Sequence, residues 1–196
     1  MERHKTMNSD LPEEFQHIEP ITTERLVLRQ MTKDDTPDVF SFMSDFHTAY
    51  WAGMRPLKTL EEAWDAIYWG NIFGEEPQYG LTVKGSDKVI GTISVSKGRD
   101  SEGHLSVFLG YLILPEHTRK GYMSEAVKAV CDDIFRRNRA GKIICEIRKD
   151  NIPSRGLATK CGFVQNPDQM KWETNFYGKE LDEFILENKF EISSRQ

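Results

Sequence analysis

The sequence has few cysteines and no long apolar run, and these two absences narrow where the protein can work. Its three cysteines, Cys131, Cys145 and Cys161, are an odd number without paired spacing, which favours reduced thiols over a disulfide framework or a metal site. We interpret them as small buried hydrophobic residues. No stretch approaches the roughly 18 apolar residues that span a bilayer, and residues 1–10 lack the apolar core of a signal peptide. We therefore expect a cytoplasmic protein with no membrane partner and no metal.

An excess of positive charge is also absent. The formal net charge of -5 argues against non-specific nucleic-acid binding, which needs Lys and Arg side chains to neutralise phosphates. The same charge suits a basic acceptor, although many mildly acidic proteins have no cationic partner. We expect no nucleic-acid partner.

The chain does contain enough apolar sequence for one folded core. Its 196 residues are 38% hydrophobic and 29% charged, which is typical of a single globular domain. The first twenty residues show no usable periodicity, so we predict a flexible or edge-lying arm at 1–20. One domain is expected at 21–190, followed by a short tail at 191–196.

Hydrophobic periodicity predicts an α/β fold, because stretches with a period of two alternate with stretches of helical period. Proline and glycine mark several of the ends. Expected strands lie at 25–30, 79–84, 88–96, 105–114, 142–148 and 181–187, and expected helices at 32–46, 60–74, 124–137 and 151–161, with an aromatic-rich loop at 47–58. This order predicts a mixed, mostly antiparallel central sheet flanked by about four helices.

The segment from Leu112 to Glu125 carries the clearest chemical signal. An apolar strand passes through Pro115 and a short polar stretch into a strongly amphipathic helix. Main-chain N–H groups converge at such a helix start, where the helix dipole is positive, and this geometry holds phosphate groups. Arg119 and Lys120 add positive charge, and Gly121 lets the backbone approach a ligand closely. An ordinary surface turn with two solvated cations fits the same residues.

Three motifs, in this order, resemble those of the GNAT superfamily of N-acetyltransferases. The sequence LGYLILPEHTRKGYMSEA at 109–126 is similar to the acetyl-CoA signature of that family. NIPS at 151–154 with CGF at 161–163 resembles the next block of the ribosomal-protein N-terminal (RimJ/RimL-like) acetyltransferases, and TERLVLR at 23–29 resembles their opening strand. The resemblance spans residues 20–188 and implies a GNAT-like α/β fold that uses acetyl-CoA as co-substrate.

The resemblance also implies a set of residues around acetyl-CoA. In the family the strands corresponding to 105–114 and 142–148 splay apart and the thioester lies between them. Main-chain N–H groups near Leu112 and Ile113 would polarise its carbonyl, although these two residues also fit an apolar core. Asn151 either caps the helix that follows or also contacts the pantetheine arm. The expected coenzyme-binding residues are Leu112, Ile113, Leu114, Thr118, Arg119, Lys120, Gly121, Tyr122, Met123, Ser124 and Asn151.

Three positions depart from the family pattern. Thr118 stands where Arg or Gln is usual, and Met123 stands where Gly or Ala is usual. Neither change removes main-chain N–H groups, but the bulk of Met123 is expected to weaken coenzyme binding. Ala158 replaces the tyrosine that protonates the leaving thiolate in many members, so another group must supply that proton.

Acetyl transfer needs a deprotonated amine and a proton for the departing thiolate. Ser154 is our candidate for assisting the thiol, because it lies one helical turn after Asn151; a serine that satisfies local backbone fits equally. Glu146 is the candidate base, since burial among isoleucines would make it more basic, and a solvent-facing carboxylate is the competing interpretation. His104 and a chain of waters are the remaining options.

The aromatic loop at 47–58 lies where the family builds its acceptor pocket. Tyr50, Trp51 and Arg55 are therefore the expected substrate-binding residues, and the aromatic faces could hold an ammonium group. Packing into the core is the commoner fate of such rings.

We expect an enzyme that transfers acetyl from acetyl-CoA to a primary amine by direct attack, with a protein N-terminal α-amine as the favoured acceptor. A small-molecule amine (polyamine, amino acid or antibiotic) is the alternative acceptor. A coenzyme A-binding regulatory module without turnover is the rival from another class. A dinucleotide-binding Rossmann domain is disfavoured because the three-glycine fingerprint is absent. A homodimer is one option for the assembly.

Overall fold

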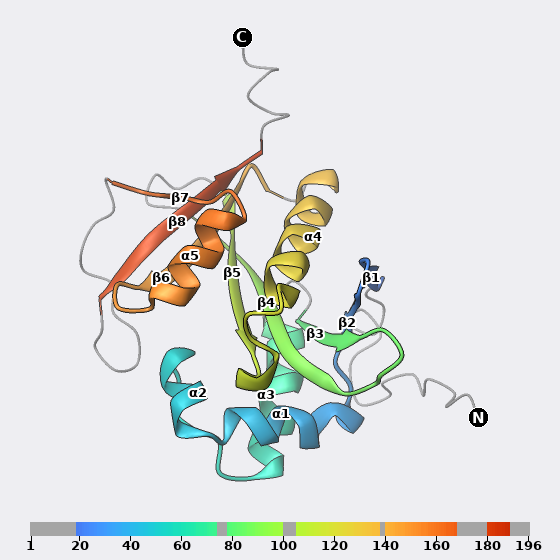
Figure 1. Ribbon diagram of the computed structural model, residues 1–196. Helices are drawn as coiled ribbons and strands as arrows, with labels where there is room; N and C mark the ends of the chain where they lie inside the picture. Colours follow the sequence, from blue (N-terminus) through green and yellow to red (C-terminus); the bar gives the residue numbers. More distant parts are fainter. Residues whose placement is uncertain (1–18, 74–77, 100–104, 138–139, 168–179, 189–196) are drawn as a thin grey trace.

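The computed structural model describes residues 19–73, 78–99, 105–137, 140–167 and 180–188 (Figure 1). Within these ranges one sheet of eight strands has the order β1-β2-β3-β4-β5-β6-β8-β7. All neighbours are antiparallel except β5 and β6. The strands are β1 (Ile21–Thr22), β2 (Leu26–Gln30), β3 (Tyr79–Val83), β4 (Val89–Arg99), β5 (Leu105–Ile113), β6 (Lys142–Arg148), β7 (Val164–Gln165) and β8 (Leu181–Glu187). The predicted α/β fold with a mostly antiparallel sheet is confirmed.

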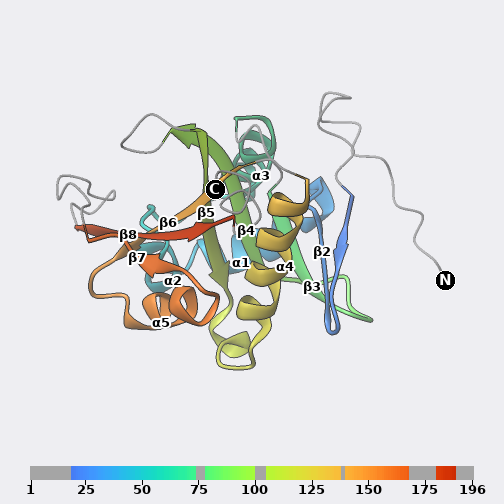
Figure 2. The ribbon, with the colours of Figure 1, turned by 90° about the horizontal axis from the view of Figure 1, so that it is seen from above.

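Five α-helices surround the sheet in the part of the chain that the structure describes, one more than the sequence predicted. They are α1 (Thr36–Met43), α2 (Phe46–Trp51), α3 (Leu60–Phe73), α4 (Tyr122–Arg136) and α5 (Ile152–Lys160), joined by short 3-10 turns at Lys33–Asp35 and Pro115–His117. Figures 1 and 2 show α4 and α5 on one face of the sheet and α3 on the other, with α1 and α2 beyond one end of the strands.

The hydrophobic patterns that predicted the elements also place the core. Leu26 and Leu28, which alternate along β2, are both fully buried, and so are Val127 and Val130 on the apolar stripe of α4. Burial of these side chains is the main source of stability. The apolar side of β2 and the apolar stripe of α4 therefore contribute to the same hydrophobic core.

The predicted loop at 47–58 is wrong for its first part, where the chain forms helix α2. Asp45 caps this helix, since its side chain accepts a hydrogen bond from the N–H of Thr48 at 2.8 Å. An aspartate at the N-cap offsets the weak helix propensity of the aromatic residues that follow. Strand β1 was also missed, and α4 begins at Tyr122 instead of Ser124 because Gly121 is its N-cap.

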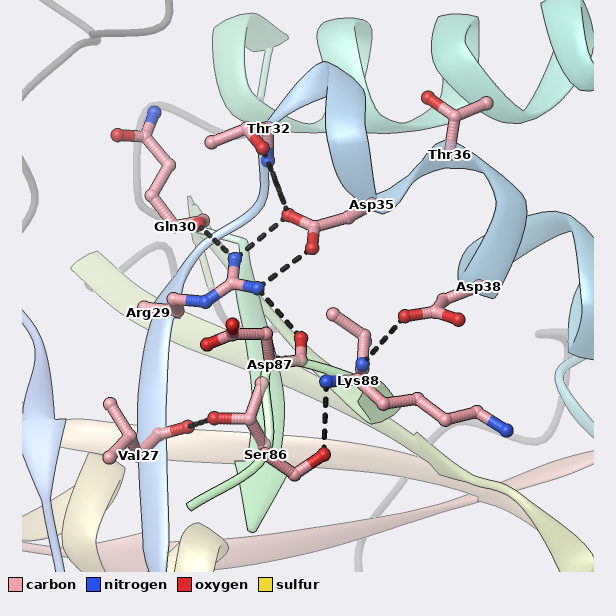
Figure 3. A network of polar contacts seen from close by, with 12 residues as sticks. Val27, Arg29, Gln30, Thr32, Asp35, Thr36, Asp38, Ser86, Asp87 and Lys88 are labelled. Carbon is pink, nitrogen blue, oxygen red and sulfur yellow. Dashed lines mark hydrogen bonds and ion pairs between the residues drawn. The ribbon is translucent and has the colours of Figure 1, made fainter. Parts of the chain in front are cut away.

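A buried ion pair ties β2 to its neighbours (Figure 3). Arg29 donates to both carboxylate oxygens of Asp35 at 2.8 and 2.7 Å, and to the carbonyl oxygens of Gln30 and Asp87. Asp35 also accepts from the N–H of Thr32 at 2.7 Å, which is half of a capping box at this helical turn. The strand, the first helical turn and the β3–β4 turn are thereby joined through one guanidinium.

Several expectations lie outside the described residues, namely most of the arm at 1–20, His104, the end of the helix predicted to reach residue 74 and the tail at 191–196. Among the helices that are described, none has the length and apolar character needed to cross a membrane. All three cysteines are free thiols, and Cys131 and Cys145 are buried.

Candidate active site

The sheet opens where β5 and β6 part. These parallel strands pair only at Val107 with Ile143 and at Phe108 with Ile144, although β5 continues to Ile113 and β6 continues for four residues beyond its last pair. On their other sides β5 stays paired with β4, and β6 with β8. The gap therefore lies between the C-terminal halves of two strands that are otherwise firmly held, as the family resemblance implied.

The ladder between β4 and β5 decides which main-chain groups face this gap. The N–H of Leu114 donates to the carbonyl of Ile90 on β4 at 2.9 Å. Because hydrogen-bonded pairs alternate along an antiparallel ladder, Leu112 also directs its N–H to β4, whereas Tyr111 and Ile113 direct theirs to the gap. Of the two N–H groups predicted to polarise the carbonyl, the geometry favours that of Ile113 and assigns that of Leu112 to the sheet.

A cavity of about 350 Å³ occupies the gap. Its walls come from the end of α2, from β5 and β6, and from the start of α5, with one residue of β8. The lining residues are Trp51, Ala52, Gly53, Leu109, Gly110, Tyr111, Cys145, Glu146, Ile147, Arg148, Asn151, Ser154 and Leu181. Four of the residues selected from the sequence, Trp51, Glu146, Asn151 and Ser154, are thus brought together here.

Tyr111 and Ser154 form a hydrogen-bonded pair on the cavity wall. The Tyr111 Oη lies 2.9 Å from Ser154 Oγ and 3.1 Å from the Ser154 carbonyl oxygen. Helix α5 presents the serine because Asn151 caps it, accepting a hydrogen bond from the Ser154 N–H at 3.2 Å. When the phenol donates to Ser154 Oγ, the serine O–H is free to donate to a group in the cavity.

Burial keeps the two weakly acidic groups of this wall protonated. Desolvation raises the pKa of the Tyr111 phenol, the nearby Cys145 thiol adds to the rise, and the hydrogen bond with Ser154 opposes it. Desolvation likewise raises the pKa of the Cys145 thiol well above its usual value. At neutral pH Tyr111 and Cys145 therefore keep their protons, and Tyr111 acts as a neutral hydrogen-bonding group.

The turn before α4 has left-handed backbone at Arg119, with φ of 60°, and at Gly121, with φ of 81°. Glycine adopts this conformation freely, but Arg119 is the one non-glycine residue with positive φ in the described part of the chain. Such strain costs on the order of 1 kcal/mol and is concentrated at functional sites. Turns of this kind direct successive N–H groups into a concavity that binds anions.

Helix α4 starts directly at this turn. Its first main-chain bond runs from the N–H of Glu125 to the carbonyl of Gly121 at 3.1 Å, so the N–H groups of Tyr122, Met123 and Ser124 have no acceptor within the helix. The Met123 side chain is only 5% exposed and belongs to the core. Its bulk is therefore accommodated in the core, and the expected weakening of coenzyme binding stays a prediction.

The turn is held from outside by the start of β2. Arg25 donates from Nε to Glu125 Oε2 at 2.7 Å and from Nη1 to the Lys120 carbonyl at 3.0 Å, and its guanidinium lies 4.8 Å from the Tyr122 ring centroid. Thr23 Oγ1 donates to Glu125 Oε1 at 2.6 Å. Desolvation opposes ionisation of Glu125, but these hydrogen bonds outweigh it and lower the pKa of this carboxyl group. We call Thr23, Arg25 and Glu125 the turn clamp.

Arg148 forms part of the cavity wall, and its side chain is only 3% exposed. Its guanidinium lies 4.1 Å from the Tyr50 ring centroid and 4.7 Å from that of Trp51. It also donates to both oxygens of Asp150 at 2.9 and 2.6 Å. The aromatic side chains selected as holders of an acceptor ammonium thus hold a cation of the protein itself. Arg55 is exposed, pairs with Glu62 at 3.2 Å and is not among the residues that line the cavity.

Glu146 lines the cavity but is exposed. The expected burial among isoleucines is wrong, because side chains alternate along β6 and Glu146 points away from the face that carries Ile147. It lies opposite Glu183 on β8. A solvent-accessible carboxylate at the mouth of the gap can still accept a proton from an incoming ammonium group.

Reasoning from the sequence missed Tyr111, Arg148 and the turn clamp as site residues. A tyrosine in an apolar strand needs a partner for its hydroxyl, and an arginine at the end of one needs a counter-charge. Both signals were present in β5 and β6. The contact between Arg25 and Glu125 joins residues 100 apart and leaves no local pattern.

No group of three or more His, Cys, Asp or Glu residues suited to a metal ion occurs among the described residues.

Comparison with protein families matches residues 25–164 to the acetyltransferase (GNAT) domain. The uncharacterized N-acetyltransferase YoaA of Bacillus subtilis (strain 168) is 28% identical over 146 residues, which cover 73% of this chain and 81% of YoaA.

Solved structures share the fold at lower identity. A GNAT-family acetyltransferase from Bacillus anthracis has a TM-score of 0.74 at 20% identity, covering 87% of this chain and 99% of its own. RimL, a ribosomal L7/L12 α-N-protein acetyltransferase solved in complex with coenzyme A, has a TM-score of 0.72 at 16% identity, covering 86% of this chain and 98% of its own.

Proposed function

The chain belongs to the GNAT acetyltransferase family, and from that premise we propose that it moves an acetyl group from acetyl-CoA to a protein N-terminal α-amine. The observation that carries the proposal is the parted pair of strands, whose cavity is lined by the Tyr111–Ser154 pair and by Arg148.

The turn at residues 118–124 suits the diphosphate of the coenzyme. Left-handed backbone at Arg119 and Gly121 and the open N–H groups of the first helical turn supply donors, and the side chains of Arg119 and Lys120 are exposed cations. A Cβ at position 121 would lie 3.3 Å from Arg25 Nη2, and the positive φ of Gly121 strains any other residue, so glycine is favoured here. We assign the diphosphate to this turn, with Asn151 beside the pantetheine arm.

The residues of the gap can perform each proton movement. Glu146 accepts the proton of the acceptor's ammonium, and the neutral amine attacks the thioester carbon while the N–H of Ile113 stabilises the developing oxyanion. The carbon–sulfur bond then breaks, and Ser154, oriented by Tyr111 at 2.9 Å, donates its proton to the thiolate and takes up the extra proton of the new amide nitrogen, so the serine ends neutral. Ser154 thereby takes the role that a tyrosine at the position of Ala158 performs in many relatives.

The choice of acceptor draws on two kinds of support. The fold neighbour RimL acts on the α-amine of a ribosomal protein, and the same subgroup resemblance appears in the sequence motifs. Residues 51–53, at the end of α2, also line the cavity, so an acceptor bound there would contact this helix.

Calorimetry with coenzyme A and thiol release from acetyl-CoA test the proposal together. We expect coenzyme binding, and thiol release with peptides that carry a free N-terminus. No coenzyme binding would remove the enzymatic assignment. Release with polyamines or antibiotics but not peptides would move the acceptor to the small-molecule class, and binding without any release would make the protein a regulatory module.

A further inference from the structure

Arg148 gives the acceptor end of the cavity a positive wall. Its guanidinium is stacked against Tyr50 and Trp51 and almost completely buried, and it lines the cavity. Hydrogen bonding to Asp150 raises the pKa of Arg148, so its charge is permanent. An acceptor with a second ammonium group near this wall would be repelled, whereas an electronegative oxygen would be attracted.

The guanidinium also has a donor to spare. Arginine carries five N–H groups. Four of the five on Arg148 are used within the described residues: Nε and Nη2 donate to Asp150, Nη2 donates to Tyr50 Oη, and Nη1 donates to the Tyr50 carbonyl. One N–H on Nη1 has no acceptor among these residues. Leaving a buried donor unsatisfied is costly, so a ligand oxygen at this place is favoured.

The opposite charge lies two residues earlier on the same strand. Glu146 and Arg148 both line the cavity, and residues two apart on a strand are about 7 Å apart on one face. A primary amine with an oxygen on the adjacent carbon can place its ammonium near the carboxylate and its oxygen near the guanidinium. A plain alkyl amine has nothing to offer the arginine.

We propose that Arg148 is a specificity-determining residue that donates a hydrogen bond to the carbonyl oxygen next to the acceptor's amine. The acceptor class is then an α-amino carbonyl compound, such as the first residue of a peptide, and not a bare alkyl amine or a polyamine. This inference rests on the proposed acetyl transfer and adds the feature by which the acceptor is recognised.

The test uses a matched pair of acceptors, alaninamide and isopropylamine. In isopropylamine a methyl group replaces the carboxamide, so the carbonyl oxygen next to the amine is missing. We expect Arg148→Met to raise the KM for alaninamide about tenfold to a hundredfold, as expected for loss of a charge-assisted hydrogen bond. The kcat for alaninamide and the kcat/KM for isopropylamine should stay within about twofold. Arg148→Lys, which keeps a cationic donor, should regain part of the loss.

Arg155→Met is the control variant. Arg155 is also paired with an aspartate, Asp182, and lies 5.3 Å from the Phe184 ring centroid, but it is not among the cavity-lining residues. It should leave the KM for alaninamide unchanged. Calorimetric titration of alaninamide into the complex with coenzyme A measures the same preference without turnover, so a variant that is only slow is not mistaken for one that fails to bind.

The two hypotheses fail differently. If wild-type protein binds coenzyme A but releases thiol with no amine, the proposed function is wrong. If wild-type protein acetylates alaninamide and Arg148→Met loses both acceptors equally, or loses neither, the role of Arg148 is wrong while the enzyme assignment stands. Folding of each variant is checked by its thermal midpoint.

Discussion

Arg29 and Arg148 each grip an aspartate with two hydrogen bonds, but they lie in parts of the molecule that use the pair differently. Around Arg29 every named partner belongs to the framework, and Asp35 is only 6% exposed (Figure 3). Around Arg148 the carboxylate of Asp150 is 56% exposed, and the guanidinium borders a cavity. We call the Arg29–Asp35 pair closed, because both partners are shielded from solvent, and the Arg148–Asp150 pair open, because its aspartate is exposed.

The difference teaches how to separate a structural ion pair from a functional one. In the closed pair, both charges and the surrounding carbonyl oxygens satisfy each other. In the open pair, the arginine is buried while its partner remains in water, and two aromatic faces hold the guanidinium in addition to the Tyr50 carbonyl. Burial of the cation alone does not distinguish them; the exposure of the anion does.

The largest expected effect contrasts the two arginines in stability. Arg29→Met leaves Asp35 buried without its counter-charge, so we expect a loss of about 3–5 kcal/mol in the free energy of unfolding. Arg148→Met leaves Asp150 hydrated, and the loss should be about 1 kcal/mol. Urea unfolding of both variants measures the two values, and equal losses would break the comparison.

Catalysis should show the opposite ranking. Ser154→Ala removes the hydroxyl that faces the cavity, and we expect kcat to fall about a hundredfold with little change in the coenzyme dissociation constant. Tyr111 only orients that hydroxyl, so Tyr111→Phe should lower kcat about fivefold. Steady-state kinetics with alaninamide decide this. Arg29→Met, assayed at a temperature where it is folded, should keep its kcat, and a comparable decrease there would contradict the assignment.

Alkaline pH should lower the stability contributed by Tyr111 at the cavity and leave that of the Arg29–Asp35 pair unchanged. Burial raises the pKa of Tyr111, so the folded protein retains a proton that the unfolded chain releases. This stabilisation is complete below about pH 10, the pKa of an unburied phenol, and is lost as the pH rises toward the folded pKa, by about 1.4 kcal/mol per pH unit. The Arg29 guanidinium, whose pKa its hydrogen bond to Asp35 raises, stays charged throughout.

Urea unfolding at about pH 8 and about pH 11 measures this difference. Wild-type protein should lose more stability between the two values than Tyr111→Phe. Burial also raises the pKa of Cys131 and Cys145, but these thiols are present in both proteins and cancel. Equal losses in the two proteins would show that Tyr111 titrates normally.

The smallest expected effect concerns the stacked ring. Trp51→Ala should raise the KM of the acceptor about threefold to tenfold by loosening Arg148, while the coenzyme dissociation constant is unchanged. Trp64→Ala is the matched control, because Lys33 Nζ lies 5.6 Å from its ring centroid and Trp64 does not line the cavity. If both variants changed KM alike, stacking on Arg148 would not be the cause.

Most of the fold was predictable because its determinants are local. Strand β6 was predicted with its observed bounds, since an apolar run between Gly141 and Asp150 has one interpretation. Helix α2 was not, because aromatic residues are poor helix formers, and its stability draws on the cap at Asp45 and on burial of Thr48 and Ala49.

The site was predictable where a motif carries it. The turn before α4 and the cap at Asn151 follow from short patterns whose chemistry is main-chain. Ser154, the partner of Tyr111, and Tyr50, the aromatic partner of Arg148, lie 43 and 98 residues away, and such contacts depend on the packing of α5 and α2 against the sheet. Long-range pairing of this kind has no periodicity in a single sequence.

The turn clamp sets an order of assembly. Arg25 and Glu125 stand 100 residues apart in the chain, so during synthesis β2 exists long before the helix it will hold. A fragment that starts after Arg25 retains the signature at 109–126 but has nothing to fix the Lys120 carbonyl, so a search for the shortest active piece of this protein must begin no later than Thr23.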